Sequence, residues 1–282
     1  PLSLTSFTPM SVSFGDTITI SGLNFPKPQS LITATLLEEQ ATIINNSSTQ
    51  LRILVPNNVV VPKSSIIVRA GVQSVNSTGE IDLLKPVITN FTPSKGTKET
   101  EVIISGNYFS PIKENNRIEI NGITLTVIEA SKTTLKAKIP SGIVPGHYDI
   151  SITVATQNVV STSQIEIIKP LITNVNPING TWGNTVTISG ENFGNSINDN
   201  IVKFDNVQAT IISASPSEIK VLIPNNLLKK NSTLSVQAIT IDNLSSEYGT
   251  PFILNSPTIT SFTPDEGKSK SQVTVYGENF NP

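Results

Sequence analysis

Pro177-Ile-Asn-Gly180-Thr-Trp-Gly183-Asn-Thr-Val-Thr-Ile188-Ser-Gly190-Glu-Asn-Phe193 is the stretch that decides the fold, because related stretches begin at Pro9, Pro93 and Pro264. The four starting prolines are therefore separated by 84, 84 and 87 residues. In every copy a glycine lies thirteen residues after the proline, and a phenylalanine follows three residues later. Repetition at a fixed long period indicates an array of similar structural units. A second mark confirms the register, since a hydrophobic-Pro step lies thirty-four residues beyond the glycine at Pro56, Pro140 and Pro224.

The period divides the chain into three complete repeats and the start of a fourth. Repeat 1 is residues 1–85, repeat 2 is 86–169, repeat 3 is 170–255, and residues 256–282 begin repeat 4. Since the sequence opens without methionine and stops inside repeat 4, we expect it to be part of a longer chain. Pro86, Pro170 and Pro257 stand at the joints, where proline fixes φ and favours extended backbone. We therefore expect short, stiff joints and an extended rod.

The composition excludes several classes of function. Lys plus Arg total 19 against 21 Asp plus Glu, which gives no excess of cations for phosphate binding, so we expect no nucleic acid partner. Without cysteine the chain has no disulfides, thiolate metal sites or thiol nucleophiles. No apolar run approaches the roughly twenty residues of a membrane-spanning helix. A secretion signal or membrane anchor would then lie outside this segment.

Within each repeat, apolar and polar residues alternate in short segments rich in β-branched side chains, which is typical of strands. No segment repeats apolar residues with the helical period of 3.6 over about ten residues without a helix-breaking residue. We expect an all-β fold in which each repeat forms a two-sheet sandwich of seven strands. In repeat 2 the predicted strands are residues 87–91, 101–105, 117–120, 123–128, 134–139, 147–154 and 164–168.

Turn residues agree with this prediction in two of the repeats. Asn121-Gly122 lies between two alternating segments and favours a type I′ hairpin, and Asp205-Asn206 occupies the equivalent place in repeat 3. Repeat 1 has Leu37-Glu38 there. These residues are unusual in such a turn, so we expect a different hairpin in repeat 1.

The repeated stretch resembles the IPT/TIG domain, an immunoglobulin-like sandwich of the E-set type. The motif Pro-x-x-Gly-x-x-Gly-x-x-Val-x-Ile-x-Gly-x-x-Phe fits repeat 3 best, whereas repeat 2 has Glu99 at the second glycine position and repeat 1 has Val12 at the first. The resemblance covers the whole chain and implies tandem sandwiches. We expect the glycines to adopt turn conformations and the phenylalanine to fill one end of the sandwich.

Functions in this family are diverse, and the fold does not choose among them. Tandem copies without cysteine are similar to those of social-amoeba adhesion and self-recognition proteins, plexin-type ectodomains and bacterial surface proteins. The resemblance implies a non-catalytic extracellular segment of a cell-surface adhesion or recognition protein, with another surface protein as homophilic or heterophilic partner. The alternative is a glycan-binding or stalk segment of a bacterial polysaccharide-utilisation protein or secreted glycosidase.

We expect neither catalysis nor a cofactor. His147 is the sole histidine and has no counterpart in the other complete repeats, so we interpret it as a surface residue. The loop Asn195-Ser-Ile-Asn-Asp199-Asn200 offers oxygen ligands, but one carboxylate is little charge for calcium. We predict a solvated loop and no metal site.

Two aromatic residues and a set of asparagines are candidate surface sites. Phe14 and Trp182 occupy equivalent loop positions in repeats 1 and 3, where they could anchor a partner or stack on a sugar. The alternative is that they pack against the preceding repeat and stiffen the joint. Six separated Asn-x-Ser/Thr sequences are acceptors for glycans if the host glycosylates. They begin at Asn46, Asn76, Asn90, Asn179, Asn231 and Asn243, and Asn45 overlaps the first.

Overall fold

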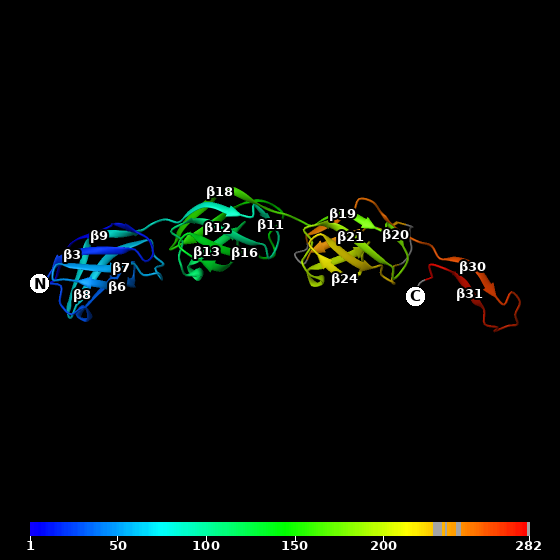
Figure 1. The fold of residues 1–282 in the computed structure, drawn as a ribbon, viewed down its shortest axis with the longest axis horizontal. Coiled ribbons are helices and arrows are strands. Elements are labelled where there is room, and N and C mark those ends of the chain that lie inside the picture. Colours follow the sequence, from blue (N-terminus) through cyan, green and yellow to red (C-terminus); the bar gives the residue numbers. More distant parts are fainter. Residues whose placement is uncertain (228–232, 235, 241–243, 281–282) are drawn as a thin grey trace. The chain divides into compact units, whose positions relative to one another are not determined.

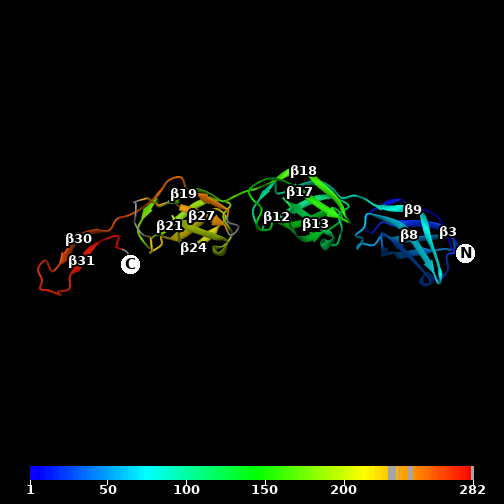
Figure 2. The same ribbon diagram turned by 180° about the vertical axis from the view of Figure 1, so that it is seen from behind.

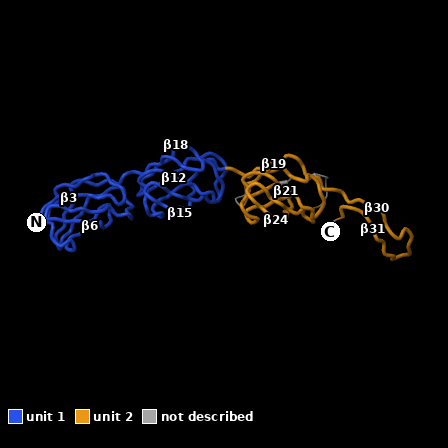
Figure 3. The backbone as a smooth tube through the Cα atoms, viewed as in Figure 1, with its two compact units in different colours: residues 1–167 blue, residues 168–282 orange. Residues whose placement is uncertain are grey.

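The computed structural model describes residues 1–227, 233–234, 236–240 and 244–280. The chain forms two compact units, residues 1–167 and residues 168–282 (Figure 3). Repeats 1 and 2 make up the first unit, and repeat 3 with the start of repeat 4 makes up the second. Strands dominate the described residues. Short 3-10 helices interrupt them at η1 (Gln29–Leu31), η2 (Lys113–Asn115) and η3 (Ile197–Asp199).

Repeat 1 is a sandwich of two sheets (Figure 1). One sheet has the strand order β1-β3-β7-β6, and the other has the order β2-β9-β8-β4-β5, in which only β2 and β9 run parallel. The strands are β1 (Ser3–Thr8), β2 (Ser11–Val12), β3 (Thr17–Leu23), β4 (Ile32–Leu36), β5 (Glu39–Gln40), β6 (Thr42–Asn46), β7 (Gln50–Leu54), β8 (Lys63–Ala70) and β9 (Gln73–Leu83).

Repeat 2 has the same topology, with sheets of order β10-β12-β16-β15 and β11-β18-β17-β13-β14 (Figure 2). Side chains alternate between the sandwich interior and solvent, so that Ile118, Ile120, Ile150 and Ile152 are fully buried. The strands are β10 (Val87–Thr92), β11 (Lys95–Gly96), β12 (Glu101–Asn107), β13 (Asn116–Ile120), β14 (Ile123–Thr124), β15 (Thr126–Ala130), β16 (Thr134–Lys138), β17 (Gly146–Val154) and β18 (Gln157–Ile167).

The structure corrects the predicted strand count of repeat 2. The segment predicted as one strand over 123–128 is two strands, because β14 pairs with β13 in one sheet whereas β15 pairs with β16 in the other. The chain changes sheets at Leu125, which is buried and donates its N–H to the Ile118 carbonyl. Strand β18 is longer than the predicted 164–168, and β11 was not predicted.

Repeat 3 follows the same plan, with sheets of order β19-β21-β25-β24, β23-β22-β27-β28 and β20-β29-β26. Repeat 4 contributes one antiparallel hairpin, β30 (Thr258–Thr263) with β31 (Thr274–Glu278). The strands of repeat 3 are β19 (Leu171–Asn176), β20 (Asn179–Gly180), β21 (Thr185–Glu191), β22 (Asn200–Phe204), β23 (Val207–Gln208), β24 (Thr210–Ser215), β25 (Glu218–Leu222), β26 (Thr233–Leu234), β27 (Val236–Thr240), β28 (Ser245–Glu247) and β29 (Phe252–Leu254).

The glycine that closes the repeated stretch allows two strands to approach closely. A Cβ atom on Gly106 would lie 1.9 Å from the Val87 carbonyl oxygen and 2.5 Å from Cζ of Phe109. Gly22, Gly190 and Gly277 are equally confined. Gly106 lies in a strand and lacks a positive φ, so the reason for this glycine is space and the predicted turn conformation was wrong. Phe109 is fully buried, as expected for a residue that fills the sandwich end.

The second glycine position does adopt the predicted turn conformation. Its φ angle is positive in all four repeats, including those that have another residue there: Gly15 (73°), Glu99 (64°), Gly183 (74°) and Lys270 (71°). A side chain one residue later then accepts a hydrogen bond from the backbone N–H three residues before it. The bonds are Ser13 to Asp16 Oδ2 (2.7 Å), Thr97 to Thr100 Oγ1 (2.9 Å), Thr181 to Asn184 Oδ1 (3.1 Å) and Lys268 to Ser271 Oγ (3.0 Å).

The hairpin in repeat 1 does not differ as predicted. Leu37 and Glu38 have φ angles of 50° and 66°, close to the 51° and 75° of Asn121 and Gly122. The Leu37 side chain is fully buried, and its N–H donates to Ser64 Oγ at 2.6 Å. Burial of a leucine stabilises the fold by about 2 kcal/mol. This offsets the cost of a left-handed backbone at a residue that does not favour it.

An asparagine fixes the chain where it enters repeats 1, 3 and 4. In repeat 3, Asn192 has a φ of 61°, and its side-chain amide donates to the Lys169 carbonyl at 3.1 Å. Lys169 precedes the joint proline Pro170, which is buried. Asn24 and Asn279 make equivalent bonds, whereas repeat 2 has Tyr108 with the same positive φ.

Repeats 1 and 2 are joined by two side-chain bonds within their common unit. Lys132 Nζ donates to the Phe14 carbonyl at 3.1 Å, and Gln157 Nε2 donates to the Leu83 carbonyl at 3.0 Å. Repeat 3 has Pro216 at the position equivalent to Lys132.

Candidate interaction surface

The structure places both candidate aromatic residues inside their own repeats. Phe14 is fully buried in the core of the first unit and offers no side-chain surface to a partner. Trp182 is half-buried against the core of repeat 3, and its Nε1 donates to the Leu227 carbonyl at 3.2 Å. The loop that contains Phe14 contacts the following repeat through Lys132. Both aromatic side chains therefore pack within their own repeats.

The residues weighed for catalysis or calcium do not form a reactive group. His147 is exposed on β17, opposite Glu166 of β18. Asp199 Oδ2 accepts hydrogen bonds from the N–H and the hydroxyl of Ser196, at 3.1 and 2.8 Å. The carboxylate therefore stabilises the loop in which it lies. Across the described ranges, no group of three or more His, Asp or Glu side chains could hold a metal ion.

The predicted glycan acceptors differ in accessibility. Asn76, Asn90 and Asn179 are exposed. Asn46 is half-buried, and its side-chain amide donates to the Pro26 carbonyl at 2.7 Å, which occupies the nitrogen that a glycan would modify. Asn231 and Asn243 lie outside the described residues.

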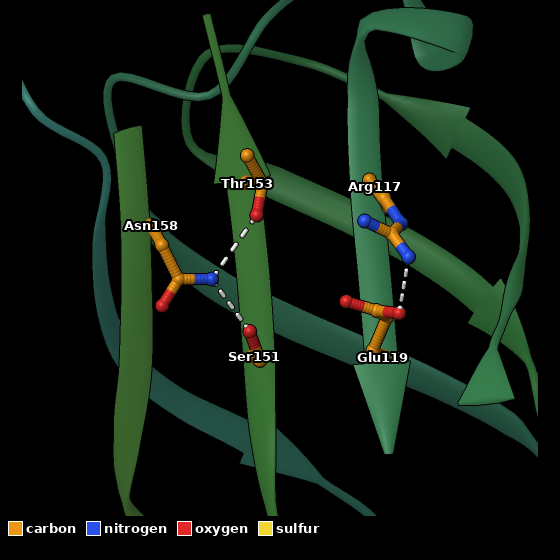
Figure 4. Close-up of polar contacts among 5 residues, drawn as sticks. All are labelled: Arg117, Glu119, Ser151, Thr153 and Asn158. Atoms are coloured by element: carbon orange, nitrogen blue, oxygen red, sulfur yellow. Dashed lines mark hydrogen bonds and ion pairs between the residues drawn. The ribbon is translucent and has the colours of Figure 1, made fainter. Parts of the chain in front are cut away.

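A group of ordered polar side chains lies on the outer surface of one sheet of repeat 2 (Figure 4). We call it the repeat 2 face; it comprises Arg117, Glu119, Ser151, Thr153 and Asn158. Arg117 Nη2 lies 2.7 Å from Glu119 Oε1 along β13. Asn158 on β18 donates through Nδ2 to Ser151 Oγ at 2.7 Å and to Thr153 Oγ1 at 3.0 Å on β17. The five side chains thus span three neighbouring strands.

Strand register brings these residues together. Arg117 pairs with Thr153, and Thr153 pairs with Asn158, so the three side chains form one row across the sheet. The intervening residues of the same strands face the core, because side chains alternate between the two sides of a strand. Arg117 and Glu119 come from β13, whereas the other three residues come from the hairpin of β17 and β18, and no local motif marks the set. The alternation alone could have assigned each residue to the outer side.

The repeat 2 face offers hydrogen-bonding groups in fixed positions. The Arg117 side chain is 63 % exposed, whereas that of Glu119 is 17 % exposed and stays paired with it. The Asn158 carbonyl oxygen points away from the two hydroxyls that hold its nitrogen (Figure 4). The exposed guanidinium can bind a carboxylate, and the amide oxygen, which lies two strands away, can accept a hydrogen bond from a peptide group or a sugar hydroxyl.

The equivalent faces of the other repeats have different chemistry. Arg117 corresponds to Thr33 in repeat 1 and to Ile201 in repeat 3, which pair with Arg69 and Ile239 respectively. Repeat 2 is therefore the one complete repeat with an ordered charge pair at this position among the described residues.

The opposite sheet of repeat 2 carries a separate row of exposed ion pairs. Lys136 Nζ lies 2.7 Å from Glu101 Oε2 and 3.9 Å from Glu129 Oε1. The hydrogen bond from Lys136 holds the pKa of Glu101 below its usual value, and the same bond raises the pKa of Lys136. Each charge has its partner on the neighbouring strand, so these groups stabilise the sheet.

Exposed aromatic side chains are confined to the start of repeat 4, within the described part of the chain. They are Phe262, Tyr276 and Phe280. Every aromatic residue of repeats 1 to 3 is buried or half-buried, Trp182 included. The described parts of the three complete repeats therefore present no fully exposed aromatic ring to a sugar. Helices long and apolar enough to cross a membrane are not found among the described residues.

Comparison with known proteins matches the IPT/TIG domain model to residues 2–81, 86–166 and 170–253. Human fibrocystin-L is 24 % identical over 201 residues, which are 67 % of this chain and 5 % of the relative. A cyclomaltodextrin glucanotransferase of Bacillus sp. (strain 1-1) is 46 % identical over 56 residues, or 20 % of this chain and 8 % of the relative. The solved extracellular region of plexin A4 gives a TM-score of 0.37 at 14 % identity, covering 90 % of this chain and 34 % of that one. The chain spans a small part of each of these relatives.

Proposed function

The chain belongs to the IPT/TIG family, and we propose that it is a non-catalytic extracellular segment of a cell-surface protein that binds another protein. The partner is a different surface protein or a second copy of the same one. The proposal covers this segment alone.

The repeat 2 face is the observation that carries this proposal. Its side chains are held by bonds of 2.7 to 3.0 Å among themselves, so little conformational entropy remains to be lost when a partner binds. Arginine is enriched at the centres of protein interfaces because its guanidinium forms several directed hydrogen bonds. The exposed apolar side chain of Val160 borders the row, since Val160 pairs with Ser151.

A glycan-binding or stalk segment is the second candidate function. The match to a glucanotransferase over 56 residues favours it. The lack of an open aromatic side chain in the described parts of repeats 1 to 3 counts against it, because sugars commonly rest on aromatic rings. A glycan would have to be recognised by hydrogen bonds alone.

The two candidates are separated by one binding screen. The immobilised chain is tested against an array of purified extracellular protein domains, which includes the chain itself, and in parallel against an array of glycans. We expect saturable binding to a protein and none to glycans. Binding to glycans without any protein signal would overturn the proposal and favour the second candidate.

Matched variants then test the role of the repeat 2 face. Arg117→Gln and Lys138→Gln each remove one cation from an exposed ion pair of repeat 2, on opposite sheets. We expect Arg117→Gln to weaken protein binding about tenfold or more, as is usual for a central interface arginine, and Lys138→Gln to leave it unchanged. Equal effects of the two variants would contradict the assignment to this face.

A further inference from the structure

A groove recurs at equivalent places in repeats 1 and 2, beside the 3-10 helix and the free edge of the sandwich. In repeat 1 its volume is about 510 Å³, and in repeat 2 it is about 310 Å³. Gln29 and Ile43 line the first groove, and their counterparts Lys113 and Val127 line the second. The larger groove lies between η1, strands β4 and β5 of one sheet and strand β6 of the other, and β6 is at the opposite edge of its sheet from β1.

One residue difference beside the two grooves changes how the loop before the 3-10 helix is held. In repeat 2 the Asn116 side chain bonds to Ser110 N–H, to the Ser110 carbonyl and to the Ile112 carbonyl, which holds the loop before η2 in place. Asn200 does the same in repeat 3. Repeat 1 has Ile32 at this position, and the apolar isoleucine side chain cannot form these hydrogen bonds. Its loop is consequently free of that restraint.

The repeat 1 groove combines a polar rim with an apolar floor and bears no charge. Gln29, Gln40 and Thr42 are exposed at the rim. Ile32 and Ile43 form the floor and are 3 and 9 % exposed. In repeat 2 the corresponding rim holds the ion pair of Lys113 and Glu114. A neutral ligand with alternating hydrogen-bond donors and acceptors fits the repeat 1 groove.

Strand β6 forms one wall of the groove and is an edge strand, since its one sheet partner is β7. An edge strand has backbone N–H and C=O groups directed away from the sheet, which can pair with an added strand. The Ile43 carbonyl faces the groove, because it accepts a hydrogen bond from Gln29 Nε2. The Gln29 amide therefore stands where the N–H of an added strand would donate.

We propose that this groove binds an extended segment of a protein partner, which adds to the edge of β6 and replaces the Gln29 amide at the Ile43 carbonyl. This inference rests on the proposed function, because both assume that the partner is a protein. Backbone hydrogen bonds would supply affinity, and the apolar floor at Ile32 would receive one side chain of the segment. Without a ligand, Gln29 protects the edge from unwanted pairing.

The experiment uses the whole chain and a display library of random peptides, from which binders are selected and synthesised. Their affinities are measured for the unaltered chain, for Gln29→Ala and for Lys113→Ala, the matched change in the repeat 2 groove. Because a bound strand must displace the Gln29 amide, its removal should tighten binding about fivefold, which is the value of one net hydrogen bond. Lys113→Ala should have no effect.

Several results would overturn the proposal. The first is that no peptide is selected. The second is that Gln29→Ala weakens the binding of the selected peptides or leaves it unchanged. The third is that the chain binds neutral oligosaccharides and that Gln29→Ala abolishes this binding. The last result would identify a sugar site, in which Gln29 contacts the ligand directly. Arg117→Gln should not alter peptide affinity. If peptides bind but no protein domain is captured, the groove proposal stands and the assignment of the repeat 2 face is refuted. If a protein domain is captured but no peptide binds, the repeat 2 face stands and the groove proposal is refuted.

Discussion

Replacement of Asn192 tests how the repeated stretch fixes the entry of the chain into repeat 3. Asn192→Ala removes the bond to the Lys169 carbonyl, which is worth about 1 kcal/mol net. It also leaves an alanine at a φ of 61°, which costs about 1 kcal/mol more. We therefore expect the free energy of unfolding of repeat 3 to fall by about 2 kcal/mol. Asn192→Gly loses the bond but tolerates the backbone, so it should lose about 1 kcal/mol.

The assay follows urea unfolding by tryptophan fluorescence. Trp182 is the sole tryptophan of the chain and packs against the core of repeat 3, so its emission reports on this repeat without interference from repeats 1 and 2. The two variants separate the hydrogen bond from the backbone effect. Equal losses for alanine and glycine would refute the backbone part of the reasoning, and no loss in either would refute the role of the side-chain bond.

Four further predictions concern repeats 1 and 2. Glu99→Gly should raise the calorimetric stability of repeat 2 by about 0.5 kcal/mol, because relief of a positive φ exceeds the value of an exposed ion pair; a lower melting temperature would contradict it. Gly106→Ala should destabilise repeat 2 by about 3 kcal/mol in the same assay, since no space exists for the methyl group; an unchanged transition would show that the strands can separate. Folding lowers the pKa of Glu101, so its bond with Lys136 stabilises repeat 2 above the ordinary carboxyl pKa of 4.5 and is lost as the pH falls through the lower folded value. Calorimetry at a series of acid pH values should show a weaker acid dependence for Glu101→Gln, and parallel curves would argue against the pair. In a glycosylating host, mass spectrometry should find a glycan on the exposed Asn76, and an unmodified residue there would contradict its accessibility.

The sequence predicted the fold well because the repeated stretch contains the residues that the sandwich requires at fixed spacings. Strand alternation and the fixed glycine-phenylalanine spacing predicted a sandwich, and the family match confirms it. The reason for the glycine at Gly106 could not be predicted, since the collision with the Val87 carbonyl involves a strand from another segment. The hairpin at Leu37 was mispredicted because a buried side chain outweighed local turn preference.

The candidate surfaces were less predictable than the fold. Phe14 looked like a loop residue, but the turn closed by Asp16 directs it into the core. The repeat 2 face depends on the register between β13 and the hairpin of β17 and β18, which lies further along the chain, and alternation does not determine that register. The Gln29 contact joins a 3-10 helix to an edge strand, and no motif in the sequence marks it. Long-range pairing is thus the information that sequence patterns lacked.

The most direct test of the central claim is selective obstruction of the repeat 2 face. Because the chain has no cysteine, Asn158→Cys and Thr134→Cys each create a single site for a maleimide-linked polyethylene glycol, on opposite sheets of repeat 2. Both positions are exposed, and the affinity for the captured partner is measured before and after labelling. We predict that the label at position 158 abolishes binding and that the label at position 134 leaves it intact. Retained binding with the label at position 158 would contradict the claim that this face recognises the partner.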